Sequence, residues 1–382
     1  MNLRSLPQRF TTSLVIVTGI AGVVAVLVSV LAMSTGMIRT LQHTGRNDRA
    51  LVLRNGSTSE LASALSQDAV RLAMDAPGVR RNADGKPIAS AETLRMVAGY
   101  KKEDGAEVHV TLRGVGPMIA AVRPELKLIA GRMFNPAVYE IIVGKAAHTQ
   151  FKGLDVGSKF PARGVTWTVV GIYASGGDSH ESELMADAET VNSADHRGGF
   201  QNVTALLDSA SSFQKFKDSL TSNPTLAVDV STETDYLRER SKTISKVISV
   251  IAYVVGGIMA VGAIFGALNT LYSAVSARVQ EIATLRAIGF GSTAMVVSVL
   301  AEALLLALIG GVIGAVLAWL FFDGYVASTG GGANGQLVFE LSVSSQLMVL
   351  GIVWAAVIGL IGGLFPAVRA ARLPVATALR AV

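Results

Sequence analysis

Four long apolar stretches constrain this chain more than any other feature of its sequence. They cover residues 14–38, 247–272, 294–322 and 346–365. A membrane-spanning helix needs about 20 mostly apolar residues, so each stretch is long enough to cross a bilayer. The first stretch exceeds the roughly 7–15 apolar residues of a secretory signal, and we expect it to remain as an anchor. The sequence therefore predicts a polytopic α-helical membrane protein with four transmembrane helices.

The rest of the chain has the charge content of a soluble domain. Only 16% of all residues are charged, but residues 37–243 hold 25 Lys and Arg against 24 Asp and Glu. Four of the five net positive charges therefore come from outside this region, near the ends of the apolar stretches. This distribution argues against nucleic-acid binding. The surplus of positive charge instead sets the orientation of the chain in the membrane.

Seven arginines lie near the N-terminus, in the loop after the second predicted span and in the tail, all on one side of the predicted spans. They are Arg4, Arg9, Arg278, Arg286, Arg369, Arg372 and Arg380. The connection between the third and fourth spans, residues 323–345, has no Lys or Arg. Because Lys and Arg near span ends stay cytoplasmic, we expect a multi-pass protein of the cell (inner) membrane with both termini cytoplasmic. Residues 40–242 are then extracytoplasmic.

The interior of the spans is almost free of ionisable groups. Only Glu302, about two turns into the third span, is ionisable. A helix–helix hydrogen bond or a carboxyl reaching the inner interface explains it more simply than an ion relay. The spans do contain glycine pairs at four-residue spacing, which let helices approach closely. These are Gly262 with Gly266, Gly310 with Gly314, and Gly359 with Gly363. We expect a tightly packed bundle that forms a dimer, rather than a water-filled pore.

Between the first two spans, short strand-like and helix-like segments alternate. We expect strands at 51–53, 107–115, 139–143, 166–173, 202–207 and 226–230, and helices at 57–74 and 209–220. The pattern predicts an extracytoplasmic α+β domain. The two ends of this domain together form an α/β lobe. A β-rich lobe, about residues 113–199, is inserted between these ends. From about residue 234 the sequence reads as helix into the second span.

Neither a catalytic nor a metal-binding constellation stands out. Residues 78–87 end in Gly85–Lys86, but the glycine spacing and Pro87 exclude a phosphate-binding loop. Residues 178–183 gather Asp, His and Glu, which we interpret as a solvated loop rather than a metal site. The chain has no cysteine. If the protein performs work, another subunit must supply the energy.

The segment after the second span resembles the corresponding loop of FtsX-like, or MacB-type, permeases of ABC transporters. It contains Arg278, then Glu281–Ile282–Ala283, then Leu285–Arg286–Ala287–Ile288–Gly289. The next span adds Glu302 and Gly310–Gly311–Val312–Ile313–Gly314, and residues 366–380 resemble the tail of the family. The layout of one span, a large domain and three further spans also matches. No ATPase domain is present in the sequence, so the chain resembles a half-permease.

The same loop has the pattern of a docking helix. Arg278, Glu281, Ile282, Leu285 and Arg286 recur at helical spacing on one side, followed by Gly289. An apolar ridge flanked by charges fits a groove on a partner. The alternative is an amphipathic helix lying on lipid headgroups. The resemblance favours docking to an ATPase.

The resemblance implies a permease subunit of an ATP-binding-cassette export complex, which is not itself an enzyme. It would transmit ATPase-driven motion to the outer domain and so expel or extract a substrate. The implied partners are a separate ABC ATPase that carries ATP and magnesium, a second copy of the chain, membrane lipids, and a periplasmic adaptor with an outer-membrane duct. We expect no cofactor on this chain. A lipoprotein-release permease and a signalling permease that activates a cell-wall hydrolase remain alternatives.

These expectations divide the chain as follows. Residues 1–38 form the N-terminus and first span, 39–243 the MacB-type core domain, 244–273 the second span, 274–292 the coupling loop, 293–322 the third span, 323–345 an extracytoplasmic loop, 346–366 the fourth span, and 367–382 the cytoplasmic tail. The FtsX-like region covers about residues 250–377.

Overall fold

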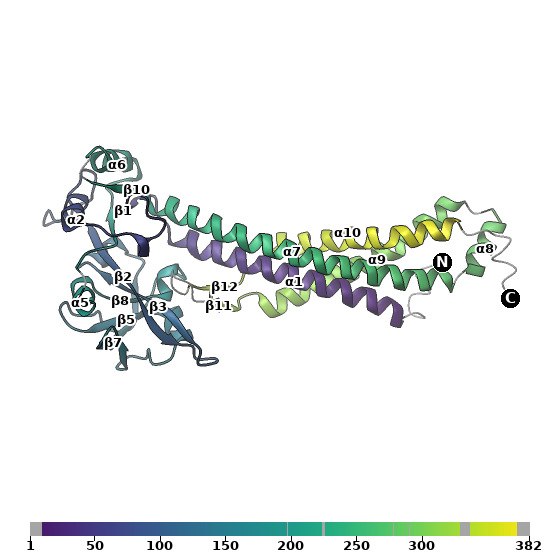
Figure 1. Cartoon of the computed structure of the whole chain (residues 1–382), viewed down its shortest axis with the longest axis horizontal. Helices are drawn as coiled ribbons and strands as arrows, with labels where there is room; N and C mark the ends of the chain where they lie inside the picture. Colours follow the sequence, from purple (N-terminus) through teal and green to yellow (C-terminus); the bar gives the residue numbers. More distant parts are fainter. Residues whose placement is uncertain are drawn as a thin grey trace. The chain divides into compact units, whose positions relative to one another are not determined.

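The computed structural model describes residues 10–196, 198–223, 226–277, 279–289, 291–328 and 337–372. The chain divides into two compact units (Figure 1). The helical unit takes in Met1–Gly36, Ile244–Tyr325 and Glu340–Val382, and the sheet unit Met37–Thr243 and Val326–Phe339. Each unit is described by itself below.

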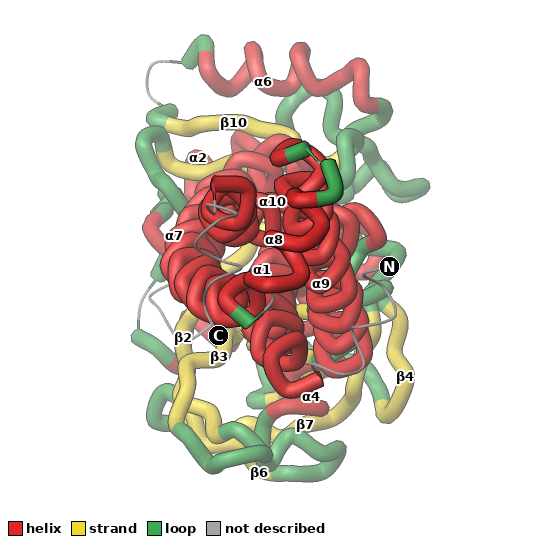
Figure 2. Tube along the Cα trace, turned by 90° about the vertical axis from the view of Figure 1, so that its right-hand side faces the viewer, coloured by secondary structure: helices red, strands yellow, loops and turns green. Residues whose placement is uncertain are grey.

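The helical unit is built from long apolar helices. They are α1 (Phe10–Thr44), α7 (Glu233–Ser276), α9 (Ser292–Phe322) and α10 (Ser345–Arg372), with the short α8 (Val279–Ala287) after α7. Within the described residues, these four long helices are apolar and long enough to cross a membrane. Figure 2 shows them gathered side by side, close to end-on. The predicted four membrane helices are confirmed.

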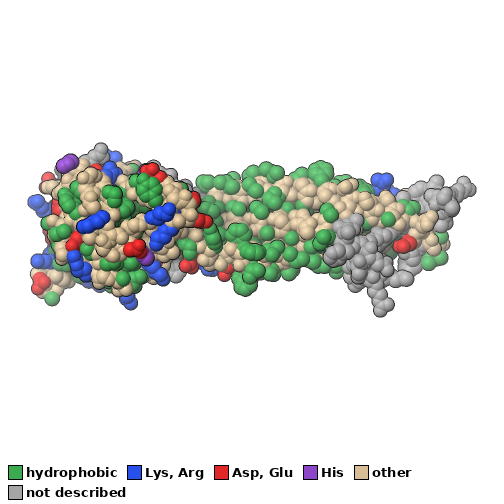
Figure 3. Space-filling model, turned by 90° about the horizontal axis from the view of Figure 1, so that it is seen from below, with side chains coloured by type: hydrophobic (Ala, Val, Ile, Leu, Met, Phe, Trp, Pro, Cys, Tyr) green, Lys and Arg blue, Asp and Glu red, His purple; other side chains and the backbone are tan. Residues whose placement is uncertain are grey.

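Small side chains fill the centre of this bundle. Ala307, Ala315 and Ala355 are completely buried, together with Ile20 and Val24 of α1. Their small volume allows the helix backbones to approach, which is how membrane helices gain packing energy where lipid is as apolar as leucine. The outward surface of these helices is largely hydrophobic (Figure 3), as contact with lipid requires.

The fourth long helix continues past the predicted end of its span. Residues 346–365 were expected, but α10 runs through the buried Pro366 to Arg372. Proline removes one backbone donor and usually ends a helix in water. Packing against neighbouring helices makes it tolerable within a bundle.

The first lobe of the sheet unit joins both ends of that unit. Strand β1 (Arg49–Arg54) lies between β10 (Val228–Thr232) and β9 (Asn202–Leu206), antiparallel to both. Helices α2 (Gln67–Met74) and α6 (Phe213–Thr221) contribute Val70, Phe216 and Leu220 to its core. The predicted β–α–β unit is therefore present, with β1 inserted between its two strands.

Strand β2 (Ala89–Tyr100) runs through both lobes. Its first residues pair with β9 and the rest pair with β3 (Glu107–Val115). The sheet then continues through β8 (Leu184–Asp187), β5 (Glu140–Gly144), β7 (Val165–Ala174) and β4 (Lys127–Gly131), while β6 (Lys159–Ala162) also pairs with β7. Because Val97 and Val110 belong to the second core, the second lobe includes residues before Arg113, where we had expected it to begin.

Shorter elements cover this second lobe. They are α4 (Lys145–Gln150), η3 (Ser179–Ser182) and α5 (Ala188–Ala194), whereas α3 (Ile119–Val122) lies against β2 and β9. Strands β11 (Val326–Ser328) and β12 (Val338–Glu340) form a separate two-stranded sheet. The Val338 backbone N–H donates to Ser182 Oγ at 2.9 Å, so part of the connection between α9 and α10 is held by the sheet unit.

One predicted helix is wrong. Instead of a helix over residues 57–74, the chain forms a short 3-10 helix η2 (Glu60–Ala62) and then α2, which Ser66 caps by accepting from the Ala69 N–H. Ser63 Oγ accepts a hydrogen bond from the Arg54 N–H, and Leu65 bridges to Phe200. These contacts hold the segment against strands β1 and β9, so a continuous helix cannot form.

Candidate functional site

A buried arginine, Arg113 on β3, joins the two lobes of the sheet unit. Its Nη1 lies 2.6 Å from Glu92 of β2, its Nε 2.6 Å from Glu183, and its Nη2 2.9 Å from Glu60 of η2. The arginine side chain is only 4% exposed, and that of Glu92 is 0% exposed. Three carboxylates around one guanidinium satisfy its donors from three separate segments, which fixes their mutual position.

The charges of this group stabilise one another. Burial alone would lower the pKa of Arg113, but Glu183, Glu60 and Glu92 outweigh it and raise that pKa well above its ordinary value. Burial alone would raise the pKa of Glu60, but Arg113 and Arg240 lower it. The buried carboxylate and the guanidinium both remain charged as a result.

A second group surrounds the first turn of α7. Glu233 accepts a hydrogen bond from Arg123 Nη1 at 2.8 Å and forms an ion pair with Arg49 at 3.1 Å. Arg49 lies on β1 and also pairs with Glu125 at 2.7 Å. A single glutamate at the start of the helix thus binds the central strand of the first lobe and the segment after α3.

One turn further along α7, Tyr236 binds the 3-10 helix η2. The Glu60 backbone N–H donates to Tyr236 Oη at 3.1 Å. Burial raises the pKa of Tyr236, so its hydroxyl stays protonated at neutral pH. Through Glu233 and Tyr236, the first turns of α7 contact both the first lobe and the Arg113 group.

The run at residues 178–183 is not the solvated loop that we expected. Asp178, His180, Glu181 and Ser182 are all buried in and beside η3. Asp178 lies 3.3 Å from His180 Nδ1 and accepts a short hydrogen bond from Ser175. No group of three possible metal ligands exists among the described residues. The acids instead cap backbone N–H groups and pair with distant cations.

Asp178 illustrates the electrostatics of this turn. Burial acts to raise its pKa, but His180, Ser175 and Arg123 outweigh burial and lower that pKa to about 2. Glu181 Oε1 accepts hydrogen bonds from the N–H groups of Ser175 and Gly177 at 2.7 and 2.8 Å. These carboxylates therefore order the loop before η3 and serve as acceptors rather than as ligands.

The predicted docking segment does contain a short helix, α8. Glu281 lies in it and is exposed, and Gly289 follows it with a φ of 101°, which favours glycine. Ile282, Leu285 and Arg286 fall within or beside its helical range, but the positions of their side chains lie outside the described part of the structure, as does Arg278 altogether. The docking role of these residues stays a prediction.

The glycines predicted for packing fall into two groups. A Cβ added to Gly310 would lie 2.8 Å from the Val17 carbonyl oxygen, and one on Gly314 would collide with that of Ala21. Gly359 and Gly363 of α10 likewise face Ala307 and Ala303 of α9. By contrast, Gly262 and Gly266 of α7 are exposed, with no described atom within 4 Å of an added Cβ.

Glu302 lies on α9 and is half-buried. Glu302 thus lies within the third long helix, as the sequence predicted. Its proposed role in helix contacts stays a prediction.

Sequence reasoning missed the buried ion groups. Glu92, Arg113 and Glu183 are spread over strands and a loop far apart in the chain, and nothing local marks them as partners. The one available signal was the presence of charged residues inside strand-like segments such as residues 107–115. Charged residues are rarely fully buried unless paired, so each of these predicts a partner without identifying it.

Four apolar helices, with a two-lobed α+β unit between the first and second, define a polytopic membrane protein with one large folded domain. Residues 10–223 match the family model described as MacB-like periplasmic core domain, and residues 253–375 match that of the FtsX-like permease C-terminal. The chain belongs to the ABC transporter permeases of this MacB and FtsX-like type.

Curated relatives carry the corresponding names. A macrolide export ATP-binding/permease protein MacB from Bdellovibrio bacteriovorus is 23% identical, over 94% of this chain and 57% of its own length. The ABC transporter permease YtrF from Bacillus subtilis is 28% identical, over 49% of this chain and 44% of its own. A macrolide export ATP-binding/permease protein MacB from Nitrobacter winogradskyi is 33% identical, over 44% of this chain and 21% of its own length. The chain thus covers less than two thirds of each of these relatives.

Solved outer domains are also similar to this chain. The extracellular domain of the noncanonic ABC-type transporter YknZ from Gram-positive bacteria matches 48% of this chain and all of that domain, at 18% identity and a TM-score of 0.37. The periplasmic region of MacB from Actinobacillus actinomycetemcomitans matches 56% of this chain and 97% of that region, at 13% identity and a TM-score of 0.38.

Proposed function

We propose that this chain is the permease half of an ATP-driven export complex, in which two copies associate with two separate ABC ATPase subunits. ATP and magnesium bind to the partner ATPases. Their closure tilts α7 by way of α8, and the sheet unit changes shape in response. In this proposal the termini and α8 lie in the cytoplasm, because seven arginines of the N-terminus, the loop after the second span and the tail gather there, and the sheet unit lies outside.

One observation carries the mechanical part of this proposal. The first turns of α7, which belong to the sheet unit, are held there at three places, since Glu233 binds Arg49 and Arg123, and Tyr236 binds the Glu60 backbone. The Arg49 and Glu233 side chains are 0% and 5% exposed. A buried, hydrogen-bonded charge pair resists separation because each partner left alone in the interior is costly. A displacement of this helix end would therefore move both lobes.

The scarcity of charged side chains along the spans supports the same view. Within the described residues, the most apolar part of each long helix holds at most two Asp, Glu, Lys or Arg residues. Transporters that pass polar substrates at mid-membrane usually have such residues there. We infer that cargo is handled by the sheet unit or at the outer leaflet, together with a periplasmic adaptor and an outer-membrane duct.

The exposed face of α7 supports association of two copies. Only 17% of its most apolar window is buried, against 33% to 44% for the other long helices. Gly262 and Gly266 lie on an exposed face of this helix. If a second copy packs on this face, the two glycines allow the α7 helices of the two copies to approach closely.

The ATPase partner is tested by affinity purification of the tagged chain in mild detergent, followed by reconstitution with the ATPase that copurifies. We expect the permease to stimulate that ATPase, and the double variant Glu281→Lys with Arg286→Glu to lose most of the stimulation. The matched control reverses Asp68 and Arg71, two exposed residues of α2. Unchanged stimulation in the α8 variant would contradict docking through α8.

The dimer is tested by native mass spectrometry in detergent. Gly266→Ile should lower the dimer fraction, whereas Ala301→Ile, at an exposed position on α9, should not. Equal dimer fractions in the two variants would place the interface elsewhere.

A further inference from the structure

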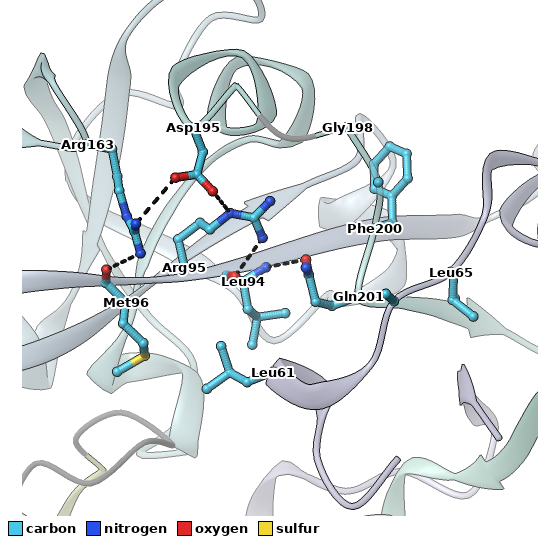
Figure 4. Close-up of a pocket in the computed structure, with 12 residues that line it drawn as sticks. Leu61, Leu65, Leu94, Arg95, Met96, Arg163, Asp195, Gly198, Phe200 and Gln201 are labelled. Carbon is cyan, nitrogen blue, oxygen red and sulfur yellow. Dashed lines mark hydrogen bonds and ion pairs between the residues drawn. The ribbon is translucent and has the colours of Figure 1, made fainter. Parts of the chain in front are cut away.

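A cavity of about 380 Å³ lies where the two lobes of the sheet unit meet. Its apolar wall comes from both lobes: Leu61 and Leu65 follow β1, Leu94 and Met96 lie on β2, and Phe200 precedes β9. Figure 4 shows these side chains around one space. Cavities of roughly 300–1,000 Å³ with apolar walls and a few polar groups are the usual form of small-molecule sites.

The opposite side of the cavity carries an excess of positive charge. Asp195 accepts from Arg95 Nε at 2.7 Å and from Arg163 Nη1 at 3.3 Å (Figure 4). Arg163 Nη2 also donates to the Met96 carbonyl oxygen at 2.8 Å. Two guanidinium groups therefore share one carboxylate, which leaves one positive charge on the polar wall of the cavity.

The two arginines differ in how firmly they are held. The Arg95 side chain is 8% exposed, and its other nitrogens donate to the Leu94 carbonyl and to Asn192. Arg163 is 39% exposed and lies on the tight turn between β6 and β7 with a φ of 55°. The contact of Arg163 with Asp195 is 3.3 Å long and its arginine is partly exposed, so this pair contributes little, about 0–1 kcal/mol, and Arg163 can exchange partners at small cost.

We propose that this cavity binds a small amphipathic anion. Its apolar body contacts Leu61, Leu94 and Phe200, and its carboxylate or sulfonate pairs with Arg163. A guanidinium offers two parallel N–H donors to such a group, which fixes its orientation as well as its charge. Arg95 stays on Asp195 and keeps that carboxylate from repelling the ligand.

The position of this cavity would link its ligand to helix α7. Leu61 belongs to η2, the 3-10 helix whose Glu60 pairs with Arg113 and whose backbone binds Tyr236. A ligand between the lobes therefore touches a segment that α7 also holds. That the ligand is cargo or a regulator of export rests on the proposed function, whereas its binding does not.

The test uses the full chain in lipid nanodiscs and two probes of matched shape, 4-phenylbutyrate and 4-phenylbutan-1-ol. Saturation-transfer NMR titrations, with empty nanodiscs subtracted, give the affinity of each. We expect the anion to bind about tenfold more tightly, the range of one charge-assisted hydrogen-bonded contact. Arg163→Gln should remove this preference, and Ala64→Trp, a substitution at the exposed rim, should weaken both probes.

The matched control is Arg132→Gln, which removes an exposed, carboxylate-paired arginine elsewhere in the same lobe. It should leave both affinities unchanged. Equal binding of the two probes, binding that survives Ala64→Trp, or no signal above empty nanodiscs would each overturn the assignment. Because no ATPase takes part, this outcome is independent of whether an ATPase partner is found.

Discussion

Arg113 Nη1 lies 2.6 Å from Glu92 Oε2 on the neighbouring strand, and the two side chains are 4% and 0% exposed. Glu92 pairs with β9 in the first lobe through its backbone, whereas Arg113 belongs to the strand that begins the second. The contact therefore sits at the junction of the lobes. Its energetics can be measured because the chain lacks cysteine, so one introduced cysteine reports unfolding through a thiol-reactive dye.

Arg113→Met should strongly destabilise the sheet unit. It removes the shared partner of Glu60, Glu92 and Glu183, and breaking a buried ion pair costs about 3–5 kcal/mol. The thermal midpoint should fall by about 10 °C, as measured with a cysteine at the buried Val203. Arg81→Met, which removes a pair that is about half exposed, should change it little. Equal midpoints for the two variants would contradict the importance of burial.

Glu233→Gln should weaken the attachment of α7 to the sheet unit. Two buried arginines, Arg49 and Arg123, lose their common carboxylate and keep only a neutral acceptor. We expect a loss of about 3 kcal/mol in the free energy of unfolding. The control on the same helix is Glu239→Gln, where the side chain is 73% exposed. Trypsin cleavage rates near the start of α7 measure the effect, and a rate no faster than that of the control would refute it.

Asp178 should make stability depend on acid pH. Its pKa is about 2 in the folded protein against 3.8 ordinarily, so its ionised form stabilises the fold above pH 3.8. That contribution, about 2 kcal/mol, is lost as the pH falls from 3.8 towards 2. The midpoint difference between wild type and Asp178→Asn should therefore be largest near pH 6 and shrink at pH 3. A difference that is constant with pH would show that the charge of Asp178 does not matter.

Gly314→Val should disrupt the helical unit, whereas Gly266→Val should not. A side chain at Gly314 meets the Ala21 backbone of α1, and one at Gly266 meets no described atom. Overpacking of this kind costs about 1–3 kcal/mol when the neighbour is backbone. A cysteine at the buried Ala315 reports the midpoint in monomeric detergent complexes. Similar midpoints for both variants would mean that α1 and α9 can separate freely.

The sequence predicted best those elements whose signal is local. The four long helices follow from apolar length alone, and strands such as β3 and β7 follow from their β-branched and aromatic residues. It failed where the decisive partner is distant. The segment at residues 178–183 reads as polar and therefore solvated, yet Arg123 and a capped turn bury it.

The same limit explains the missed strand and the wrong helix. Strand β2 carries Glu92 and Arg95 at buried positions, so its pattern lacks the alternation of a half-buried strand. Residues 57–74 have a capping signature at Ser59, but a hydrogen bond from Arg54 to Ser63 interrupts the helix. The cavity at the lobe junction was also out of reach, because Leu61, Arg163 and Phe200 meet only in three dimensions.

The place of β1 in the sheet sets an order of events during synthesis. Leu51 pairs with Thr204 on one side and with Ser231 on the other, so β1 has no sheet partner until β9 has been made and keeps one open edge until β10 follows. The second lobe, by contrast, takes its strands from one continuous stretch of chain, residues 93–187, although Val338 joins its core from a later segment. Long-range pairing of this kind is slow and leaves strand edges open meanwhile. The nascent β1 therefore presents an unpaired strand edge until the chain has been made as far as Thr232.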